Sequence, residues 1–137
     1  MAYMERKREM NKGFTVEKLE PVNPNDSRGA TLQWQFPPDW AMTQITIYYR
    51  KAGQFAGHVH SGEDPSKNPE MLLIASGRIR VTLVGLDGQT EVVELGEGSL
   101  LTIWPKVKHS MEALTDVIIV EPRRTHFNPS RPDTVPY

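Results

Sequence analysis

The 137-residue chain contains no cysteine, which excludes both disulfide bonds and thiolate metal ligands. A bound metal ion would therefore need histidine, aspartate or glutamate ligands. The chain also has no apolar run long enough to span a bilayer, and its first residues lack the apolar segment of a signal peptide. We therefore expect a cytoplasmic protein with no membrane partner.

The chain also lacks a marked excess of positive or negative charge. The chain has 16 Lys and Arg residues against 17 Asp and Glu residues, and its formal net charge is −1. Proteins that bind nucleic acids typically carry a basic stripe or patch, and the charges here are interspersed. We therefore expect no nucleic-acid partner. The length is typical of one domain and is sufficient to bury a core.

Short runs rich in β-branched and aromatic residues recur along the chain. The run 78–84 alternates polar and apolar residues, as a half-buried strand does. Turn-forming pairs such as Ser76-Gly77 and Asp87-Gly88 separate the runs. This spacing predicts an all-β barrel or sandwich, with strands over residues 43–50, 70–76, 78–84, 90–95, 100–104 and 117–120.

The two ends of the chain lack this pattern. Residues 1–13 are expected to be flexible or to form a short helix, which would include Met4 to Met10. Residues 14–122 are predicted to form the β-barrel. Residues 123–137 contain three prolines and are predicted to form an extended C-terminal tail.

The motif His58-Val59-His60 is the part of the sequence that points most directly to a functional site. Side chains alternate across a strand, so both imidazoles of an H-x-H pair point the same way. Glu70 begins an apolar run, where a carboxylate is costly to bury unless it is paired or bound to a cation. His109 follows a proline turn that could aim it into the mouth of a barrel. Together these residues predict a site for a divalent metal ion.

These residues resemble the two sequence motifs of the cupin superfamily. The first motif reads Gly53…His58-Val59-His60…Glu70, six residues and Gly77, and the second reads Gly98…Pro105…His109. The resemblance covers residues 30–122. It implies an all-β fold, the cupin-type double-stranded β-helix or jelly-roll barrel, with irregular N- and C-terminal extensions.

By this resemblance the metal ligands are His58, His60, Glu70 and His109. Nine residues separate His60 from Glu70, which is an insertion relative to the family pattern, and Asp64 within it is a rival ligand. Glu70 is preferred because it keeps the six-residue distance to Gly77 and lies on a strand. Three imidazoles and a carboxylate suit one divalent transition metal ion, such as Fe, Mn, Ni, Cu or Zn.

The second motif departs from the family pattern at its turn. Trp104 stands where a proline is common, and Lys106 stands where a glycine is common. Both substitutions affect the turn that shapes the mouth of the pocket. Lys106 is therefore a candidate substrate-binding residue.

The leading functional expectation is a metal-dependent cupin enzyme acting on a small polar metabolite. The metal ion would act as a Lewis acid on a developing enolate or alkoxide. Glu70 and His58 would be the catalytic residues, with Glu70 moving a proton. Isomerase, dehydratase or lyase chemistry fits such a site, as does dioxygenase chemistry with iron.

A second resemblance supports an alternative function. The segment from Asp26 to Leu32 is similar to a strand of the sugar-nucleotide epimerase and ketoisomerase cupins. In those proteins the strand arginine helps to hold the nucleotide phosphates, and a barrel histidine removes a proton next to a ketone. The resemblance implies a metal-free epimerase or ketoisomerase, with Arg28 as phosphate anchor and His58 or His60 as general base. Arg28 also suits an ordinary turn before a strand.

Two further expectations concern partners and aromatic residues. A non-catalytic barrel that binds a small molecule is the third functional class, because cupin folds serve many functions. Small cupin barrels commonly pair and exchange N-terminal strands, so the resemblance implies a homodimer, and residues 14–19 suit such an exchange. Tyr48 and Tyr49 point to opposite faces of a strand, so only one of them can line the barrel interior.

Overall fold

The computed structural model of the chain describes residues 12–23, 26–60, 67–126 and 134–136. The helix expected near Met4 to Met10 and the rival ligand Asp64 lie outside these ranges. No helix within them is long and apolar enough to cross a membrane. The described residues form ten strands: β1 (Phe14–Lys18), β2 (Gln44–Arg50), β3 (Gly53–His60), β4 (Glu70–Ser76), β5 (Ile79–Val84), β6 (Thr90–Leu95), β7 (Ser99–Ile103), β8 (Lys108–Ala113), β9 (Val117–Arg123) and β10 (Thr134–Pro136).

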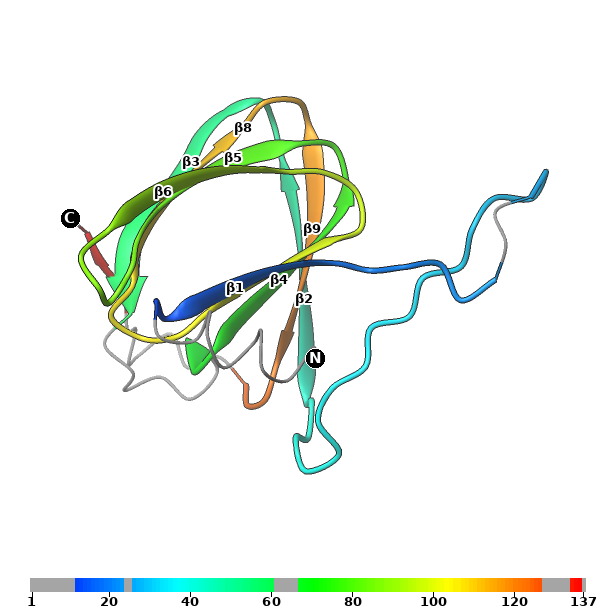
Figure 1. The fold of residues 1–137 in the computed structure, drawn as a ribbon, viewed down its shortest axis with the longest axis horizontal. Helices are drawn as coiled ribbons and strands as arrows, with labels where there is room; N and C mark the ends of the chain where they lie inside the picture. The colour runs from blue at the N-terminus through cyan, green and yellow to red at the C-terminus, as the bar shows by residue number, and fades with distance from the viewer. Residues whose placement is uncertain (1–11, 24–25, 61–66, 127–133, 137) are drawn as a thin grey trace.

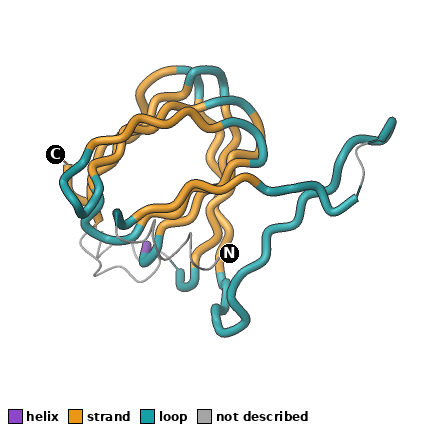
Figure 2. Tube along the Cα trace, in the orientation of Figure 1, coloured by secondary structure: helices purple, strands orange, loops and turns teal. Residues whose placement is uncertain are grey.

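The strands form two antiparallel sheets that face one another (Figure 1). The strand order is β1-β7-β4-β9-β2 in the first sheet and β10-β3-β8-β5-β6 in the second. Strands that neighbour one another in a sheet are mostly not consecutive in the sequence, so the chain crosses repeatedly between the sheets. This is the arrangement of a jelly roll, and strands make up most of the barrel wall (Figure 2). The predicted all-β jelly-roll fold is confirmed.

Side-chain alternation determines which residues enter the core between the sheets. On β5, Ile79, Val81 and Leu83 are fully buried, whereas Arg80 between them faces solvent. The same core cluster includes Leu101 of β7 in the opposite sheet. Burial of each large aliphatic side chain contributes about 1.5–3 kcal/mol. Apolar residues at alternate positions therefore hold the two sheets together.

Gly77 determines where β4 ends. Its φ angle is 86°, and a Cβ atom there would lie 2.3 Å from the carbonyl oxygen of Asp116. Only glycine adopts this conformation readily and fits this space. The turn at Gly77 therefore fixes where β4 ends. Glu70, the first residue of β4, lies at the opposite end of the strand and is buried.

The described residues 19–23 and 26–43 between β1 and β2 form an arm that leaves the barrel and returns to it (Figure 1). Its two legs are joined by isolated bridges between Pro21 and Leu32 and between Asp26 and Gly29. The strand β1, which was expected to suit exchange between copies, pairs with β7 of the same chain. The arm is therefore the segment that extends furthest from the barrel.

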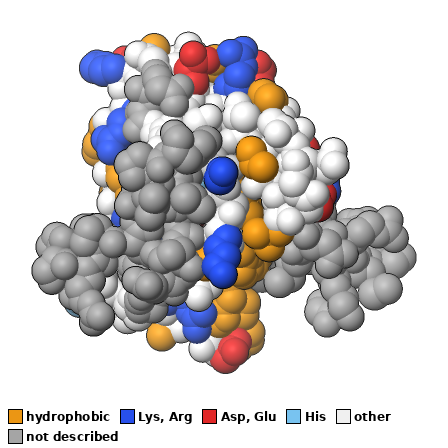
Figure 3. All heavy atoms as spheres, turned by 90° about the vertical axis from the view of Figure 1, so that its left-hand side faces the viewer, with side chains coloured by type: hydrophobic (Ala, Val, Ile, Leu, Met, Phe, Trp, Pro, Cys, Tyr) orange, Lys and Arg blue, Asp and Glu red, His pale blue; other side chains and the backbone are white. Residues whose placement is uncertain are grey.

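The outer surface mixes charges of both signs. Basic, acidic and apolar side chains are interspersed on the face drawn in Figure 3. On the outer face of the second sheet, Arg78 pairs with Glu94 at 2.6 Å, and Arg80 bridges Glu94 and Glu112 at 3.2 and 3.0 Å. These side chains are about half exposed, so the pairs contribute little to stability.

Candidate functional site

A small cavity with a volume of about 130 Å³ lies between the two sheets. This volume is slightly below that of a cavity of about 150 Å³ that binds a benzene molecule, so it is small for a ligand site. Its lining combines apolar and charged side chains: Tyr48, Arg50, Ala56, Lys67, Glu70, Leu72, Met111 and Ile119. Charged groups inside an otherwise closed barrel mark this cavity as the candidate site.

The carboxylate of Glu121 is the centre of a buried network beside the cavity. Its Oε1 atom accepts hydrogen bonds from the Tyr48 hydroxyl at 2.8 Å and from Lys67 Nζ at 3.0 Å. Its Oε2 atom lies 2.8 Å from Lys67 Nζ, and Arg123 lies 2.6 Å from Oε1. Arg123 also donates to the Tyr48 oxygen at 2.9 Å. We call these four residues the Glu121 cluster.

A second pair of polar side chains adjoins this cluster. Glu70 Oε1 lies 3.5 Å from Lys67 Nζ, and Glu70 Oε2 lies 3.4 Å from His109 Nε2. His109 Nδ1 lies 3.2 Å from the carbonyl oxygen of Val107, which can only accept, so Nδ1 carries a proton. The His109 Nε2 atom therefore faces the Glu70 carboxylate inside the barrel.

Burial and charge act together on the titratable groups of the Glu121 cluster. Burial alone would lower the pKa of Lys67, but the carboxylates of Glu70 and Glu121 outweigh it and the pKa is raised. Burial, and next the charge of Glu70, raise the pKa of Glu121 despite the nearby cations. Burial and the charge of Glu121 likewise raise the pKa of Tyr48. Lys67 is therefore a cation and Tyr48 a neutral hydroxyl at pH 7.

Strand alternation explains how these side chains meet. Glu121 and Arg123 lie at alternate positions of β9 in phase with the buried Val117 and Ile119, so all four face inward. On β2 the Tyr48 side chain faces the interior, whereas Tyr49 is 71% exposed. The prediction that only one tyrosine lines the interior is confirmed.

The predicted ligand residues lie on strands around this cavity. Glu70 is 4% exposed and His109 is fully buried, and the two side chains meet as described above. His58 of β3 pairs with His109 of β8 through the backbone, and His60 pairs with Thr134 of β10. The side chains of His58 and His60 are outside the description of the structure. The backbone thus places His58 next to the Glu70–His109 pair.

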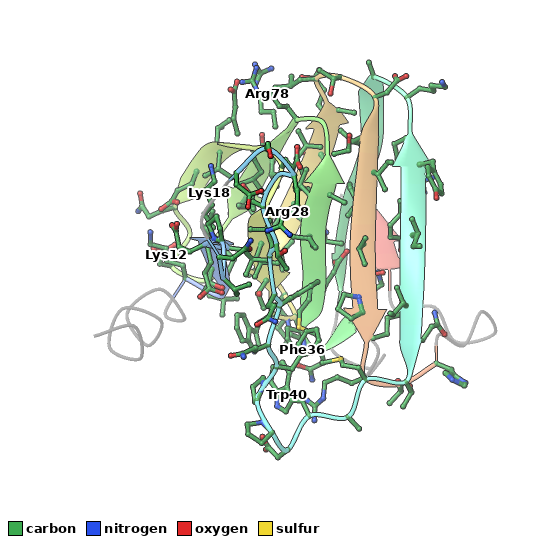
Figure 4. The ribbon with its side chains drawn as sticks, turned by 90° about the vertical axis from the view of Figure 1, so that its right-hand side faces the viewer. Lys12, Lys18, Arg28, Phe36, Trp40 and Arg78 are labelled. Carbon is green, nitrogen blue, oxygen red and sulfur yellow. The ribbon has the colours of Figure 1, made fainter. Side chains whose placement is uncertain are left out.

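The structure places the two predicted substrate-binding residues away from the cavity lining. Arg28 lies on the arm, outside the barrel (Figure 4), where its side chain is 83% exposed and pairs with Asp26 at 2.9 Å. Lys106 is exposed on the turn between β7 and β8, and its φ angle is 74°. A positive φ explains why glycine is common at the position of Lys106.

Sequence reasoning missed Lys67, Glu121 and Arg123. Lys67 lies within the inserted loop between His60 and Glu70 and precedes Glu70 by three residues, yet it is only 8% exposed. The sequence did contain an indication for Glu121 and Arg123. Both residues continue the alternation of buried positions in the apolar strand β9. Buried charges of this kind require partners, which indicates a polar cluster.

A larger groove of about 680 Å³ lies between the arm and the outer face of the first sheet. All three tryptophans of the chain, Trp34, Trp40 and Trp104, line it together with Phe36. The rings of Trp34 and Phe36 are 4.9 Å apart, and the Arg124 guanidinium lies 4.6 Å over Trp40. Phe36 and Trp40 are on the arm in front of the sheet (Figure 4). This groove lies outside the barrel, and its lining combines these aromatic rings with charged and amide side chains of β1 and the arm.

Comparison with known proteins finds no matching family model and no matching curated protein. Solved structures do match. QdtA, a sugar 3,4-ketoisomerase from Thermoanaerobacterium thermosaccharolyticum in complex with TDP, shares 15% identity over 90% of this chain and 87% of its own, with a TM-score of 0.68. WlaRB, a TDP-quinovose 3,4-ketoisomerase from Campylobacter jejuni, shares 12% identity over 92% and 94%, with a TM-score of 0.72. A dTDP-4-dehydrorhamnose 3,5-epimerase from Sulfolobus tokodaii shares 21% identity over 86% and 74%, with a TM-score of 0.64.

These findings contradict the leading prediction of a metal-dependent enzyme. The carboxylate of Glu70, the predicted metal ligand, lies 3.5 Å from the Lys67 ammonium, a cation that disfavours a metal ion at the same place. Among the side chains that the structure describes, no group of three His, Asp or Glu residues could hold a metal ion. The matching solved structures are of sugar ketoisomerases and epimerases. The described residues therefore do not fit a metal centre, and the prediction of a metal-dependent enzyme is wrong.

The matching structures also establish the fold of this chain. The matching structures cover most of this chain and most of their own, and their TM-scores indicate the same arrangement of strands. At these levels of identity the likeness concerns the fold. The chain has the cupin fold that its two sequence motifs predicted.

Proposed function

We propose that this protein is a metal-free isomerase or epimerase of nucleotide-linked keto sugars. The observation that carries the proposal is the Lys67 ammonium inside the barrel cavity, 3.5 Å from a Glu70 carboxylate that faces His109. A fixed cation beside a proton-carrying pair suits chemistry in which a carbonyl oxygen becomes negative. The similar solved structures are of two sugar ketoisomerases and a sugar epimerase, which are enzymes of this class.

Ketoisomerisation and epimerisation begin with the same step. A base removes a proton from the carbon next to the ketone, and the electron pair of the C–H bond moves to form an enolate with a negative oxygen. Ketoisomerisation ends when the enolate oxygen and the former carbonyl carbon each gain a proton and the hydroxyl of the neighbouring carbon loses one, so that this neighbour becomes the new ketone. Epimerisation ends when the proton returns to the other face of the same carbon. Neither reaction needs an external oxidant or reductant.

The residues of the cavity can be assigned to these steps. Lys67 stabilises the enolate oxygen, because a preorganised cation in a low-dielectric site acts strongly on developing charge. The Glu70–His109 pair stores and returns the proton. His58, whose backbone lies opposite His109, is the candidate general base that the sequence resemblance implied.

The proposal is tested by exchange of carbon-bound hydrogen with solvent. The protein is incubated in D₂O with TDP-linked 4-keto-6-deoxy sugars, and the products are examined by NMR and mass spectrometry. We expect deuterium at a carbon next to the ketone. A ketoisomerase labels the former carbonyl carbon, and an epimerase labels a carbon whose configuration is inverted.

The control is a Glu70→Gln variant, which keeps the shape of the side chain but cannot carry the shared proton as a carboxylate can. We expect its exchange to fall by about 10²–10⁴-fold. Tight binding of a sugar nucleotide without any deuterium incorporation would contradict the proposal. That result would favour the third functional class, a non-catalytic binding barrel.

We also propose that the chain forms a homodimer, the assembly that the cupin resemblance implied. The edge strand β2 presents an apolar outer face on which Ile45, Ile47 and Tyr49 are 68%, 50% and 71% exposed. Apolar patches of this kind commonly mark interfaces. Light scattering should give twice the 15.5 kDa chain mass, and Ile47→Glu should lower it. A mass of one chain for the unaltered protein would contradict the dimer.

A further inference from the structure

We infer that Arg50, at the mouth of the barrel cavity, binds the diphosphate of the substrate, an inference that rests on the proposed function. Arg50 is the last residue of β2 and follows Tyr48 by two positions, so both side chains leave the strand on the same side. Both line the cavity. Arg50 is exposed to solvent, whereas Tyr48 is half-buried. Arg50 is therefore placed where the cavity opens.

The size of the cavity bears on where the phosphates of a substrate can lie. A volume of about 130 Å³ leaves no room for a nucleoside diphosphate. A nucleotide-linked sugar can therefore enter only with its ring, and its phosphates must lie where the cavity meets the surface. Arg50 is the exposed cation among the cavity-lining residues.

The charge of Arg50 is also not neutralised by any of the described side chains. Lys67 and Arg123 beside the cavity are both paired with Glu121. In the part of the chain that the structure describes, no carboxylate forms an ion pair with Arg50. Its guanidinium instead lies 4.9 Å over the ring of Tyr48 and makes a long contact of 3.4 Å with the carbonyl oxygen of Tyr49. The cation is thus held in place by an aromatic ring while its charge remains for a ligand.

The chemistry of the side chain suits a diphosphate. A guanidinium presents several N–H donors in a planar fork that matches two phosphate oxygens at once. Arg28, the phosphate anchor expected from sequence, differs on both counts, because its guanidinium pairs with Asp26 and it does not line the cavity of its own chain. The geometry therefore favours Arg50 over Arg28 for this task.

The experiment measures binding of TDP by isothermal titration calorimetry to five proteins. They are the unaltered protein, Arg50→Gln, Arg50→Lys, Arg28→Gln and the control Lys51→Gln. Lys51 is the next residue, is 92% exposed, pairs with Asp116 and does not line the cavity, so its replacement removes one charge at the same end of β2. Thermal melting shows whether each variant is folded.

We expect Arg50→Gln to weaken TDP binding by about 10- to 100-fold, because hydrogen bonds between charged groups are lost. The affinity of Arg50→Lys for TDP should lie between those of Arg50→Gln and the unaltered protein, since lysine keeps the positive charge but lacks the planar set of N–H donors. Lys51→Gln should bind as the unaltered protein does. In the exchange assay, Arg50→Gln should raise KM with kcat nearly unchanged, because the phosphates do not react.

Two outcomes would overturn the inference. If Arg50→Gln binds TDP as tightly as the unaltered protein, or if Arg28→Gln alone loses affinity, the anchor lies elsewhere while the proposed function stands. If the unaltered protein binds no TDP and catalyses no exchange, the proposed function fails together with the inference. The two failures are thus distinguishable.

Discussion

Replacing Lys67 with methionine is expected to lower kcat for a nucleotide-linked keto sugar by about 10²–10³-fold, the usual cost of losing one oxyanion-stabilising group. The physical reason is that the Lys67 ammonium is only 8% exposed and lines the cavity, where the proposed function assigns it to the enolate oxygen. Methionine keeps the length and much of the volume of the side chain, so the variant tests the charge. Steady-state kinetics and the rate of deuterium exchange both measure the effect.

Lys51→Met is the matched control, because it makes the same substitution at an exposed lysine outside the cavity. We expect its kcat to stay within about threefold of the unaltered protein. A folded Lys67→Met variant with undiminished kcat would show that Lys67 serves the structure alone. Lys67→Arg, which keeps the positive charge, should retain more activity than Lys67→Met.

Replacing Glu121 with alanine is expected to reduce the free energy of unfolding by about 3–5 kcal/mol, the usual cost of removing one partner of a buried ion pair. Glu121 is fully buried and accepts hydrogen bonds from Tyr48 and Lys67, and it also pairs with Arg123. Its removal leaves two buried cations without this carboxylate. Urea unfolding followed by circular dichroism measures the change.

Glu112→Ala provides the comparison at the surface. Glu112 pairs with Arg80 at 3.0 Å, but both side chains are about 45% exposed, so the loss should be below about 1 kcal/mol. Equal effects of the two substitutions would contradict the view that burial gives the Glu121 cluster its importance. Glu121→Gln, which keeps an acceptor oxygen, should fall between the two.

Much of the fold was predictable from local pattern. The alternation over 78–84 and the β-branched runs predicted strands that the structure shows within a residue or two, such as β5 and β6. The spacing from Glu70 to Gly77 also predicted β4 correctly, because a glycine is required at its end. These features depend on residues close together in the sequence, so they can be read without knowing which strands pair.

The site was only half predictable. The cupin motifs indicated Glu70 and His109, and these side chains do meet, but the same residue types serve a metal ion and a proton relay equally well. The metal prediction failed because it took no account of Lys67, which lies in no periodic pattern. The sequence of an insertion does not show where its residues lie in the fold. Lys67, the cation that distinguishes a metal site from a proton relay, could therefore not be identified from sequence.

By itself the sequence determined an all-β barrel, six of the ten strands that the structure describes and two motif residues at its centre, because side-chain alternation and turn residues act locally. Tertiary structure alone decided that Tyr48 on β2, Lys67 before β4 and the two charged residues of β9 share one network. It also decided that Arg28 lies outside the barrel and Arg50 at the mouth of the cavity. These placements depend on pairing between strands far apart in the chain, and such pairing follows from packing of the whole barrel.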